Sequence, residues 1–227
     1  MENKILFTTT DLVIGHHLSS KNKERVLCTG ISFDIRQEDC IMLCGANGSG
    51  KTTLMKNLAM SGREDIIMIP ARIPKIAGFT LTEFVRLSCF SRTDMSGRLS
   101  PDQESSLNLA IATLGLSHLA DRDISTLSDG EFQKAGIASA LVRKAYIILL
   151  DEPTAFLDAQ NRISVLKTLK DICSKEHRPA VIFSTHDLHD GLNVCNRVFA
   201  IGADGTFHIS RDSSPEAKSN TVNEIFR

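Results

Sequence analysis

One stretch of the chain has the residue types and the spacing that are needed to hold a phosphate group. Gly45 to Thr52 reads Gly-Ala-Asn-Gly-Ser-Gly-Lys-Thr and fits the pattern G-x-x-x-x-G-K-[ST]. Glycines let backbone amides turn inward around phosphate oxygens, and a helix that follows adds the partial positive charge of its N-terminus. We expect Lys51 to reach the terminal phosphates of a nucleotide and Thr52 to offer its hydroxyl to Mg²⁺. The residues expected to bind the phosphates are Gly45, Asn47, Gly48, Ser49, Gly50, Lys51, Thr52 and Thr53.

Two acidic residues after a later apolar run could take part in a reaction at those phosphates. Asp151 and Glu152 directly follow the run from Tyr146 to Leu150. Mg²⁺ is held by few carboxylates together with water and phosphate oxygens, so Asp151 suffices as a metal ligand or as an anchor for one. Glu152 could polarise the water that attacks the γ-phosphate. An Asp-Glu-Pro sequence after a strand is often only a turn, but the phosphate loop favours the catalytic interpretation.

A histidine stands in the corresponding place after another apolar run. His186 follows Ala180 to Ser184 in the sequence Ser-Thr-His-Asp. At the end of a strand it could contact the γ-phosphate and hold Glu152 and the water in line. A solvated or helix-capping histidine is the alternative. The position at a strand end favours a catalytic role, which His186 would share with Glu152 and Lys51.

A second anion site is indicated at Leu127-Ser128-Asp129-Gly130-Glu131. Ser128 and Glu131 fit the capping box S-x-x-E, which predicts a helix that runs to about Lys144. A capped helix start that contains glycine can also hold an anion, so Ser128 and Gly130 are candidate phosphate contacts. The chain's own phosphate loop already accounts for one nucleotide, and these residues alone name no ligand for the second site.

The apolar runs predict an α/β fold with a mostly parallel sheet. Continuous runs rich in β-branched residues are typical of parallel strands that are covered on both faces. Cys40 to Cys44 leads into the phosphate loop and Lys51 to Leu58 has helical spacing, which is the context of a P-loop NTPase core. The expected strands are Cys40–Cys44, Ile66–Ile69, Tyr146–Leu150 and Ala180–Ser184.

Two smaller parts are expected around this core. Leu12–Ile14 and Ile31–Ile35 predict a small antiparallel N-terminal sheet. The stretch from 79 to 121 lacks strand-like runs and is interpreted as an inserted helical subdomain, with helices at Leu81–Leu87 and Glu104–Leu114. We therefore expect one domain over 1–227, with the α/β core at 1–78 and 122–210, the helical subdomain at 79–121, and a tail at 211–227 with a last helix near Thr221–Phe226.

Composition limits the partners. The formal net charge is −1 and the chain has one Tyr and no Trp, which counts against nucleic-acid binding. We expect no transmembrane helix or signal peptide, and a cytoplasmic protein with reduced thiols, because the six cysteines form no C-x-x-C pair. We expect Cys44 to be a small buried residue at a strand end. A metal site formed by Cys40 and Cys44 is the alternative.

In motif order, the chain resembles the nucleotide-binding subunit of ABC transporters over nearly its whole length. Gly45 to Thr52 matches the Walker A motif, and Leu127 to Glu131 resembles the LSGGQ signature with acidic residues at two positions. Ile147 to Glu152 matches Walker B, Thr154 to Asp158 the D-loop, and His186 the switch histidine. A signature between Walker A and Walker B is highly specific to this superfamily.

The resemblance implies a dimer and a membrane partner. Two subunits, expected to be identical, would dock head to tail with each ATP and its Mg²⁺ between one Walker A and the partner's signature, which gives Ser128 and Gly130 their ligand. Such a subunit would lie on the inner face of the cell membrane, bound to an integral membrane permease. The sequences Leu-Ser-Asp-Gly-Glu and Thr-Ala-Phe-Leu-Asp are most similar to importers of iron-siderophore, haem and cobalamin complexes.

Two positions are less typical of the family. The adenine-stacking aromatic residue of the family falls near His16 here, a weaker π-platform than tyrosine, and a simple loop histidine is the alternative. The family usually has a glutamine after the strand that ends at Ile69-Pro70, and this chain has Ala71. That departure concerns the coupling of hydrolysis to transport and does not affect the phosphate loop or Glu152.

Three functions follow from these observations. The leading hypothesis is an ATPase that powers a membrane importer by closing on two ATP and reopening after hydrolysis. A soluble ABC ATPase that acts on DNA or ribosomes is the second, although the chain lacks the long coiled-coil arms or fused domains of that class. A degenerate subunit that binds ATP and regulates a partner is the third, motivated by Ala71.

Overall fold

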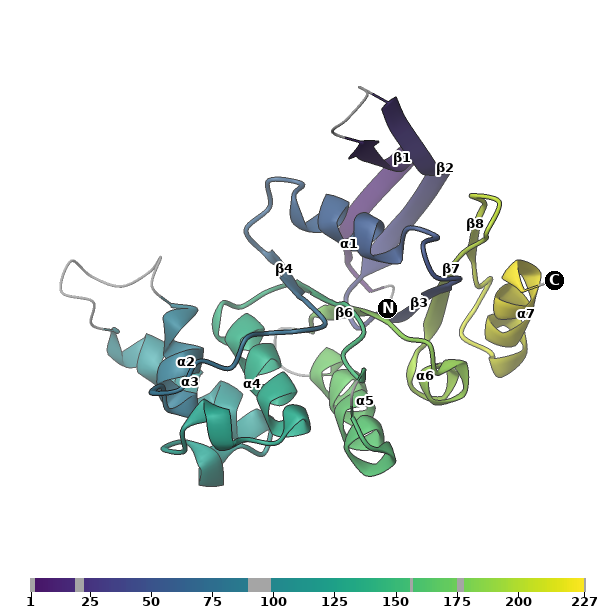
Figure 1. Cartoon of the computed structure of the whole chain (residues 1–227). Coiled ribbons are helices and arrows are strands. Elements are labelled where there is room, and N and C mark those ends of the chain that lie inside the picture. The colour runs from purple at the N-terminus through teal and green to yellow at the C-terminus, as the bar shows by residue number, and fades with distance from the viewer. Residues whose placement is uncertain (1–2, 19–22, 90–98, 156, 175–177, 227) are drawn as a thin grey trace.

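The computed structural model describes residues 3–18, 23–89, 99–155, 157–174 and 178–226, without the side chains of residues 16–18, 23 and 24. A sheet of six strands forms its centre, in the order β4-β5-β6-β3-β7-β8 (Figure 1). Neighbouring strands in this part of the chain are parallel except β7 and β8, which are antiparallel. The prediction of an α/β fold with a mostly parallel sheet is confirmed. The strands are β3 (Cys40–Gly45), β4 (Ile66–Ile69), β5 (Ile147–Leu150), β6 (Ala180–Ser184), β7 (Arg197–Ile201) and β8 (Phe207–Ile209).

Alternate side chains of each central strand enter two separate cores, which explains why the strands are apolar throughout. In β3, Ile41 and Leu43 pack with α1 (Lys51–Ala59), whereas Met42 and Cys44 belong to the core on the other face. That second core includes α4 (Asp129–Val142) and α5 (Ala159–Cys173), and α6 (Leu188–Val194) packs at its edge. Figure 1 shows these helices on the opposite side of the sheet from α1.

The N-terminal antiparallel pair is longer than the sequence pattern indicates. β1 (Ile5–Leu18) pairs with β2 (Lys23–Arg36), and their register shifts at several bulges. These bulges interrupt the alternation of apolar and polar residues, which is why the pattern revealed only short pieces. Phe33 of β2 lies 4.9 Å from Phe199 and 5.8 Å from Phe207, between ring centroids, and thereby fixes the pair to the sheet.

The described parts of the expected helical subdomain, residues 79–89 and 99–121, contain helices that pack against α4. α2 (Leu81–Leu87) lies where it was expected, and α3 (Pro101–Thr113) begins three residues earlier than Glu104. Ser100 accepts a hydrogen bond from the backbone of Gln103, whose side chain binds Ser100 in return, and Pro101 suits the first helical position. Short 3-10 turns follow at Ser117–Leu119 and Ile124–Thr126.

The tail is more ordered than its polar sequence indicates. α7 (Pro215–Ile225) begins six residues before the expected start at Thr221, capped by the hydroxyl of Ser214. Lys218 is buried and donates hydrogen bonds to the carbonyl oxygens of Leu192 (2.8 Å) and Cys195 (2.7 Å) at the end of α6. The described part of the tail therefore packs on the core, with a longer helix than expected.

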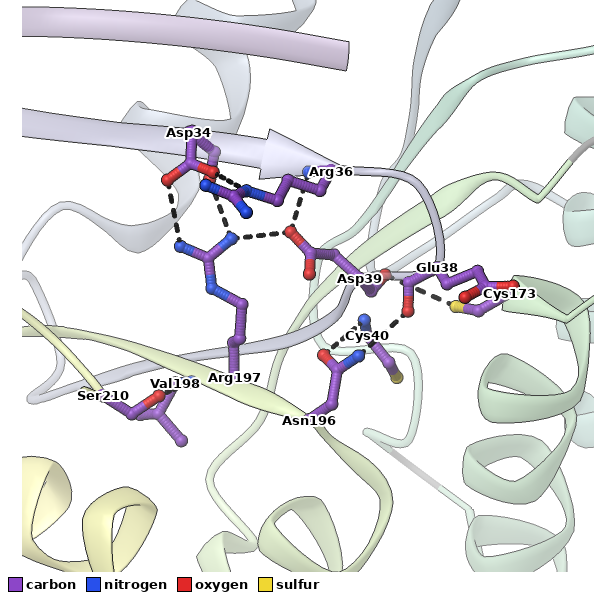
Figure 2. A network of polar contacts seen from close by, with 10 residues as sticks. All are labelled: Asp34, Arg36, Glu38, Asp39, Cys40, Cys173, Asn196, Arg197, Val198 and Ser210. Atoms are coloured by element: carbon purple, nitrogen blue, oxygen red, sulfur yellow. Dashed lines mark hydrogen bonds and ion pairs between the residues drawn. The ribbon is translucent and has the colours of Figure 1, made fainter. Parts of the chain in front are cut away.

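A polar network closes the edge of the sheet where β3 and β7 begin, opposite the phosphate loop (Figure 2). Arg197 donates to the buried carboxylate of Asp39 (2.7 Å) and to the backbone oxygen of Asp34 (2.9 Å). The side chain of Asn196 accepts from the amide of Cys40 (2.9 Å) and donates to the carbonyl of Glu38 (3.0 Å). These contacts join the N-terminal pair of strands to the central sheet.

We expect Arg197→Met to destabilise the protein by about 3–5 kcal/mol at neutral pH, because the Asp39 carboxylate would stay buried without its cation. Burial raises the pKa of Asp39, the charge of Arg197 opposes that rise, and the variant loses this opposition. An acid whose pKa is raised by folding contributes stability below its unfolded pKa and loses it as pH rises through the folded pKa. The deficit should therefore shrink as pH falls toward the unfolded pKa near 3.8.

Urea unfolding of Arg197→Met and wild type at pH 7 and pH 5 measures this difference. Arg211→Met is the matched control. Arg197 and Arg211 both line a cavity of about 840 Å³, but Arg211 is exposed. We expect the control to change stability by less than about 0.5 kcal/mol. A deficit in Arg197→Met that grows toward acidic pH would contradict the assignment to Asp39.

Candidate functional site

The phosphate loop lies between β3 and α1, as the motif predicts. β3 ends at Gly45 and α1 begins at Lys51. Gly50 has a φ of 113°, and a Cβ atom there would lie 2.9 Å from the Ile14 side chain of β1. A side chain at position 50 would be both strained and obstructed, so the loop needs glycine there. The N-terminal strand pair therefore contacts the loop directly.

Lys51 is the charged centre of this loop. Its ammonium donates hydrogen bonds to the carbonyl oxygens of Gly45 (2.8 Å) and Ala46 (3.1 Å), and the residue is 7% exposed. Burial lowers the pKa of Lys51, and the negative charge of Glu152 acts in the opposite direction. Burial also raises the pKa of the neighbouring Cys44 to about 12, which keeps that thiol neutral. Cys44 is a packing residue, as expected.

The loop has the features that an anion needs. Ser49 is 8% exposed, and its hydroxyl oxygen has no hydrogen-bond partner among the described residues. Gly50 precedes α1 without a side-chain cap, and the first turn of the helix carries no acidic residue. Buried hydroxyls and helix N-termini seek hydrogen-bond partners, so these groups fit a nucleotide phosphate.

One residue of α1 and two residues at the ends of β5 and β6 form one hydrogen-bonded unit beside the loop. Thr52 donates to Oδ2 of Asp151 (2.8 Å), and Ser184 donates to Oδ1 of the same carboxylate (2.9 Å). A threonine hydroxyl and one carboxylate oxygen suit Mg²⁺, which takes few protein ligands. Ser184, which is fully buried, also accepts a hydrogen bond from the backbone amide of Glu152 (2.8 Å). Ser184 was not anticipated as a site residue, although a hydroxyl that ends an apolar strand was a visible signal.

Glu152 and His186 meet at the exposed side of this unit. Oε1 of Glu152 lies 2.7 Å from Nε2 of His186, and the two side chains are 34% and 51% exposed. β5 and β6 are neighbours in the sheet, so residues that follow them are brought together. Glu152 has a φ of 47°, which is uncommon for a residue with a side chain and is held here by the Ser184 hydrogen bond. The carboxylate is thus oriented by its backbone and by the imidazole.

We expect Ser184→Ala to lower kcat for nucleotide hydrolysis about tenfold, because Asp151 and the Glu152 amide lose the group that joins them. Stability should fall by about 1–3 kcal/mol, because a buried amide would lose its acceptor. Steady-state phosphate release and urea unfolding measure the two effects. Ser174→Ala, at an exposed helix end, is the control. An unchanged kcat in Ser184→Ala would show that the bridge does not position the acids.

The start of α4 lies on a separate element, with its own hydrogen bonds. The Ser128 hydroxyl accepts from the backbone of Glu131 (3.3 Å), and the Glu131 side chain accepts from the backbone of Ser128 (2.8 Å). A Cβ atom at Gly130 would lie 3.2 Å from the side chain of Asn161 on α5. Ser128 and Gly130 are therefore partnered within α4 and with α5 rather than with the phosphate loop.

Ala71 follows β4 and lines a cavity of about 630 Å³ that also borders Gln133 on α4. Gln133 is 8% exposed, and its Nε2 has no hydrogen-bond partner among the described residues. Sequence reasoning did not select Gln133. The backbone of His16 belongs to β1 and pairs with Arg25, but its side chain is outside the described part, so the adenine-stacking role stays a prediction.

Across the described ranges, no three His, Cys, Asp or Glu side chains gather to hold a metal ion, which leaves the alternative site on Cys40 and Cys44 without a third ligand. All six cysteines are buried, and none of them forms a disulfide within the described ranges. Every helix in the described ranges is too short or too polar to cross a bilayer.

Comparison with known proteins agrees with the motif order. The family model "ABC transporter" matches residues 28–155. The aliphatic sulfonates import ATP-binding protein SsuB 2 of Pseudomonas savastanoi pv. phaseolicola is 36% identical over 78% of this chain, which spans 65% of that relative's length. SsuB of Granulibacter bethesdensis, likewise an aliphatic sulfonates import ATP-binding protein, is 32% identical over 92% of this chain and 89% of its own.

The fold agrees as well. The crystal structure of a nucleotide-free ATP-binding cassette from an ABC transporter aligns with a TM-score of 0.82, at 17% identity, over 100% of this chain and 98% of that one. At this identity the structural likeness shows the fold alone, whereas the family model and the relatives show the family from the sequence. The chain therefore belongs to the ABC transporter family and has the fold of its ATP-binding cassettes.

Proposed function

We propose that this chain binds and hydrolyses ATP as the energising subunit of an ABC importer, working as two copies beneath a membrane permease. One observation carries the proposal. A continuous set of hydrogen bonds runs from Thr52 beside the phosphate loop through Asp151, Ser184 and Glu152 to His186. This arrangement joins a place for phosphates and Mg²⁺ to a general base. A protein that only stored or sensed ATP would not need the last two residues in this geometry.

The residues suggest the following division of roles. Lys51 and the amides at the start of α1 would hold the β- and γ-phosphates, and Thr52 and Asp151 would hold Mg²⁺. Mg²⁺ bound there would offset negative charge on the phosphates as the bond to the γ-phosphate breaks. The oxygen of a water molecule would attack the γ-phosphorus, and the bond from that phosphorus to ADP would break as ADP leaves. The carboxylate of Glu152 would take the proton that the water loses. His186 would keep that carboxylate in line through its hydrogen bond.

A second copy would complete the site. Ser128 and Gly130 open α4 as a helix N-terminus, which suits the γ-phosphate of ATP held by the partner's phosphate loop. In this arrangement the pair closes on two ATP molecules and reopens after hydrolysis. The protein would then sit at the cytoplasmic face of the membrane, held there by its permease.

Two observations favour different cargoes for the transporter. The curated relatives are named for the import of aliphatic sulfonates, which favours small organic anions. The signature Leu-Ser-Asp-Gly-Glu instead resembles that of iron-siderophore, haem and cobalamin importers. We propose the sulfonate class first because the similarity to those relatives covers most of the chain. Stimulation of the assembled transporter's ATPase by a sulfonate rather than by a metal chelate would distinguish them.

Recovery of the full chain from cells, followed by an ATPase assay, tests the proposal. We expect an integral membrane protein to co-purify and the preparation to release phosphate from ATP. Co-purification with ribosomes or DNA instead would favour a soluble ABC ATPase. ATP binding without any phosphate release would favour the degenerate regulatory subunit that Ala71 brought into question.

A further inference from the structure

A lysine outside the recognised motifs lies between two oxygens at the start of α4. Nζ of Lys75 is 2.7 Å from the carbonyl oxygen of Leu127 and 2.7 Å from Oδ1 of Asp129. It also lies 5.6 Å from the centre of the Phe132 ring. Lys75 comes from the connection between β4 and α2, so this contact joins two segments that are about fifty residues apart in sequence. Its side chain is 26% exposed, whereas that of Asp129 is 63% exposed.

The charge at this helix start needs explanation. The first turn of α4 carries two acids, Asp129 and Glu131. Acids stabilise a helix N-terminus, but they oppose the binding of a second anion at the same place. Burial raises the pKa of Glu131, and hydrogen bonds from Ser128 outweigh that effect and lower it, so Glu131 stays ionised at neutral pH. Glu131 is engaged in the capping box, whereas Asp129 is 63% exposed and is paired with Lys75.

We propose that Lys75 is a positioning residue that neutralises Asp129 and fixes the start of α4 so that Ser128 and Gly130 can face the γ-phosphate of ATP bound by a second copy. This inference rests on the proposed function, in which α4 completes the partner's site. It also gives the segment after Ala71 a physical link to the reaction. The link is the ammonium group of Lys75, whereas the glutamine that the family usually has at position 71 is replaced here by Ala71.

A charge role and a simple anchoring role predict opposite results for a double variant. Lys75→Met removes the ammonium and leaves the Asp129 carboxylate uncompensated beside the anion. Asp129→Asn removes that carboxylate and leaves the bond from Lys75 to Leu127. If Lys75 neutralises charge, adding Asp129→Asn to Lys75→Met restores function. If Lys75 only anchors α4, the double variant is as impaired as Lys75→Met, because Lys75→Met alone already removes the contacts with Leu127 and Asp129.

The experiment uses full-length variants in the Glu152→Gln background, with ATP-dependent dimer formation measured by light scattering and ATP binding measured with a fluorescent ATP analogue. We expect Lys75→Met to raise the protein concentration needed for dimerisation about tenfold, with less effect at high salt because exposed charges are screened. Binding of the analogue to the monomer should not change. Asp129→Asn should dimerise at least as well as the Glu152→Gln parent, and the double variant should recover most of the loss. Lys75→Arg, which keeps the charge, should lie close to that parent.

The controls separate failure of this inference from failure of the proposed function. Lys134→Met removes a cation from α4 that binds the Ser164 hydroxyl instead, and dimerisation should not change. Thermal unfolding of each variant checks that the fold is intact. If Glu152→Gln itself does not dimerise with ATP, the proposed function is wrong. If it does, and Lys75→Met matches it or the double variant is not restored, only the role of Lys75 is wrong.

Discussion

Glu152→Gln is expected to lower the rate of ATP hydrolysis at least about a hundredfold and to leave ATP binding unchanged. Glutamine has nearly the same shape and can still bond to His186, which lies 2.7 Å from the carboxylate, but it cannot take a proton from water. Binding should persist because the groups proposed to hold the phosphates, Lys51 and the amides at the start of α1, are separate from Glu152. Phosphate release and light scattering in the presence of ATP measure the two properties, and a stable ATP-bound dimer is the expected species.

Glu216→Gln serves as the control for that result, because it removes an exposed acid in the first turn of α7 and should leave the rate unchanged. An ATPase rate in Glu152→Gln close to that of wild type would exclude Glu152 as the base. Loss of ATP binding in the same variant would indicate that Glu152 holds the nucleotide or shapes the loop instead.

Lys51→Met should abolish ATP binding in the useful concentration range, with an increase in Kd of about a hundredfold or more. Removal of one buried charged partner from a phosphate typically costs about 2–5 kcal/mol, which corresponds to about thirtyfold to several thousandfold. Lys51 is 7% exposed and its ammonium bonds to two loop carbonyls, so its loss also removes the contacts that shape the loop. Titration with a fluorescent ATP analogue measures the Kd, and the ATPase rate should fall in parallel.

Lys51→Arg tests whether charge alone is enough. The guanidinium is larger and planar, and the buried position between two carbonyls suits a compact ammonium, so we expect a large part of the defect to remain. Unfolding in urea checks that both variants are folded. ATP binding by Lys51→Met with the affinity of wild type would show that the loop binds phosphates through its backbone alone.

Local signals made the motif residues and the strands β3, β4, β5 and β6 predictable, whereas β7 and β8 were not among the expected strands. The order of strand, glycine loop and helix at Gly45 to Thr52 depends on neighbours in sequence, and so does the capping box at Ser128. The start of α7 had such a signal in Ser214-Pro215, but the polar composition around it suggested a loose tail. Val222 and Ile225, three residues apart, pack against the core and the buried Lys218 lies one turn earlier, so a few contacts at helical spacing dock the helix.

The missed residues act through contacts between distant parts of the chain. Ser184 joins residues 32 and 33 positions away in sequence, and Lys75 reaches residues 52 and 54 positions away. Which strand ends lie side by side depends on the strand order, and a single sequence without its pairing pattern does not fix that order. The residue types were visible, but their partners were determined only by the assembled sheet.

The hydroxyl of Ser184 has a consequence for how the site tolerates motion. It binds the side chain of Asp151 and the backbone of Glu152 at once. The proposed metal ligand and the proposed base are therefore held by one hydroxyl at the end of β6. A shift of β6 relative to β5 would therefore carry both groups together and keep their spacing. Misalignment would then arise between this pair and the phosphate loop that follows β3, which is joined to them by the hydrogen bond from Thr52 to Asp151.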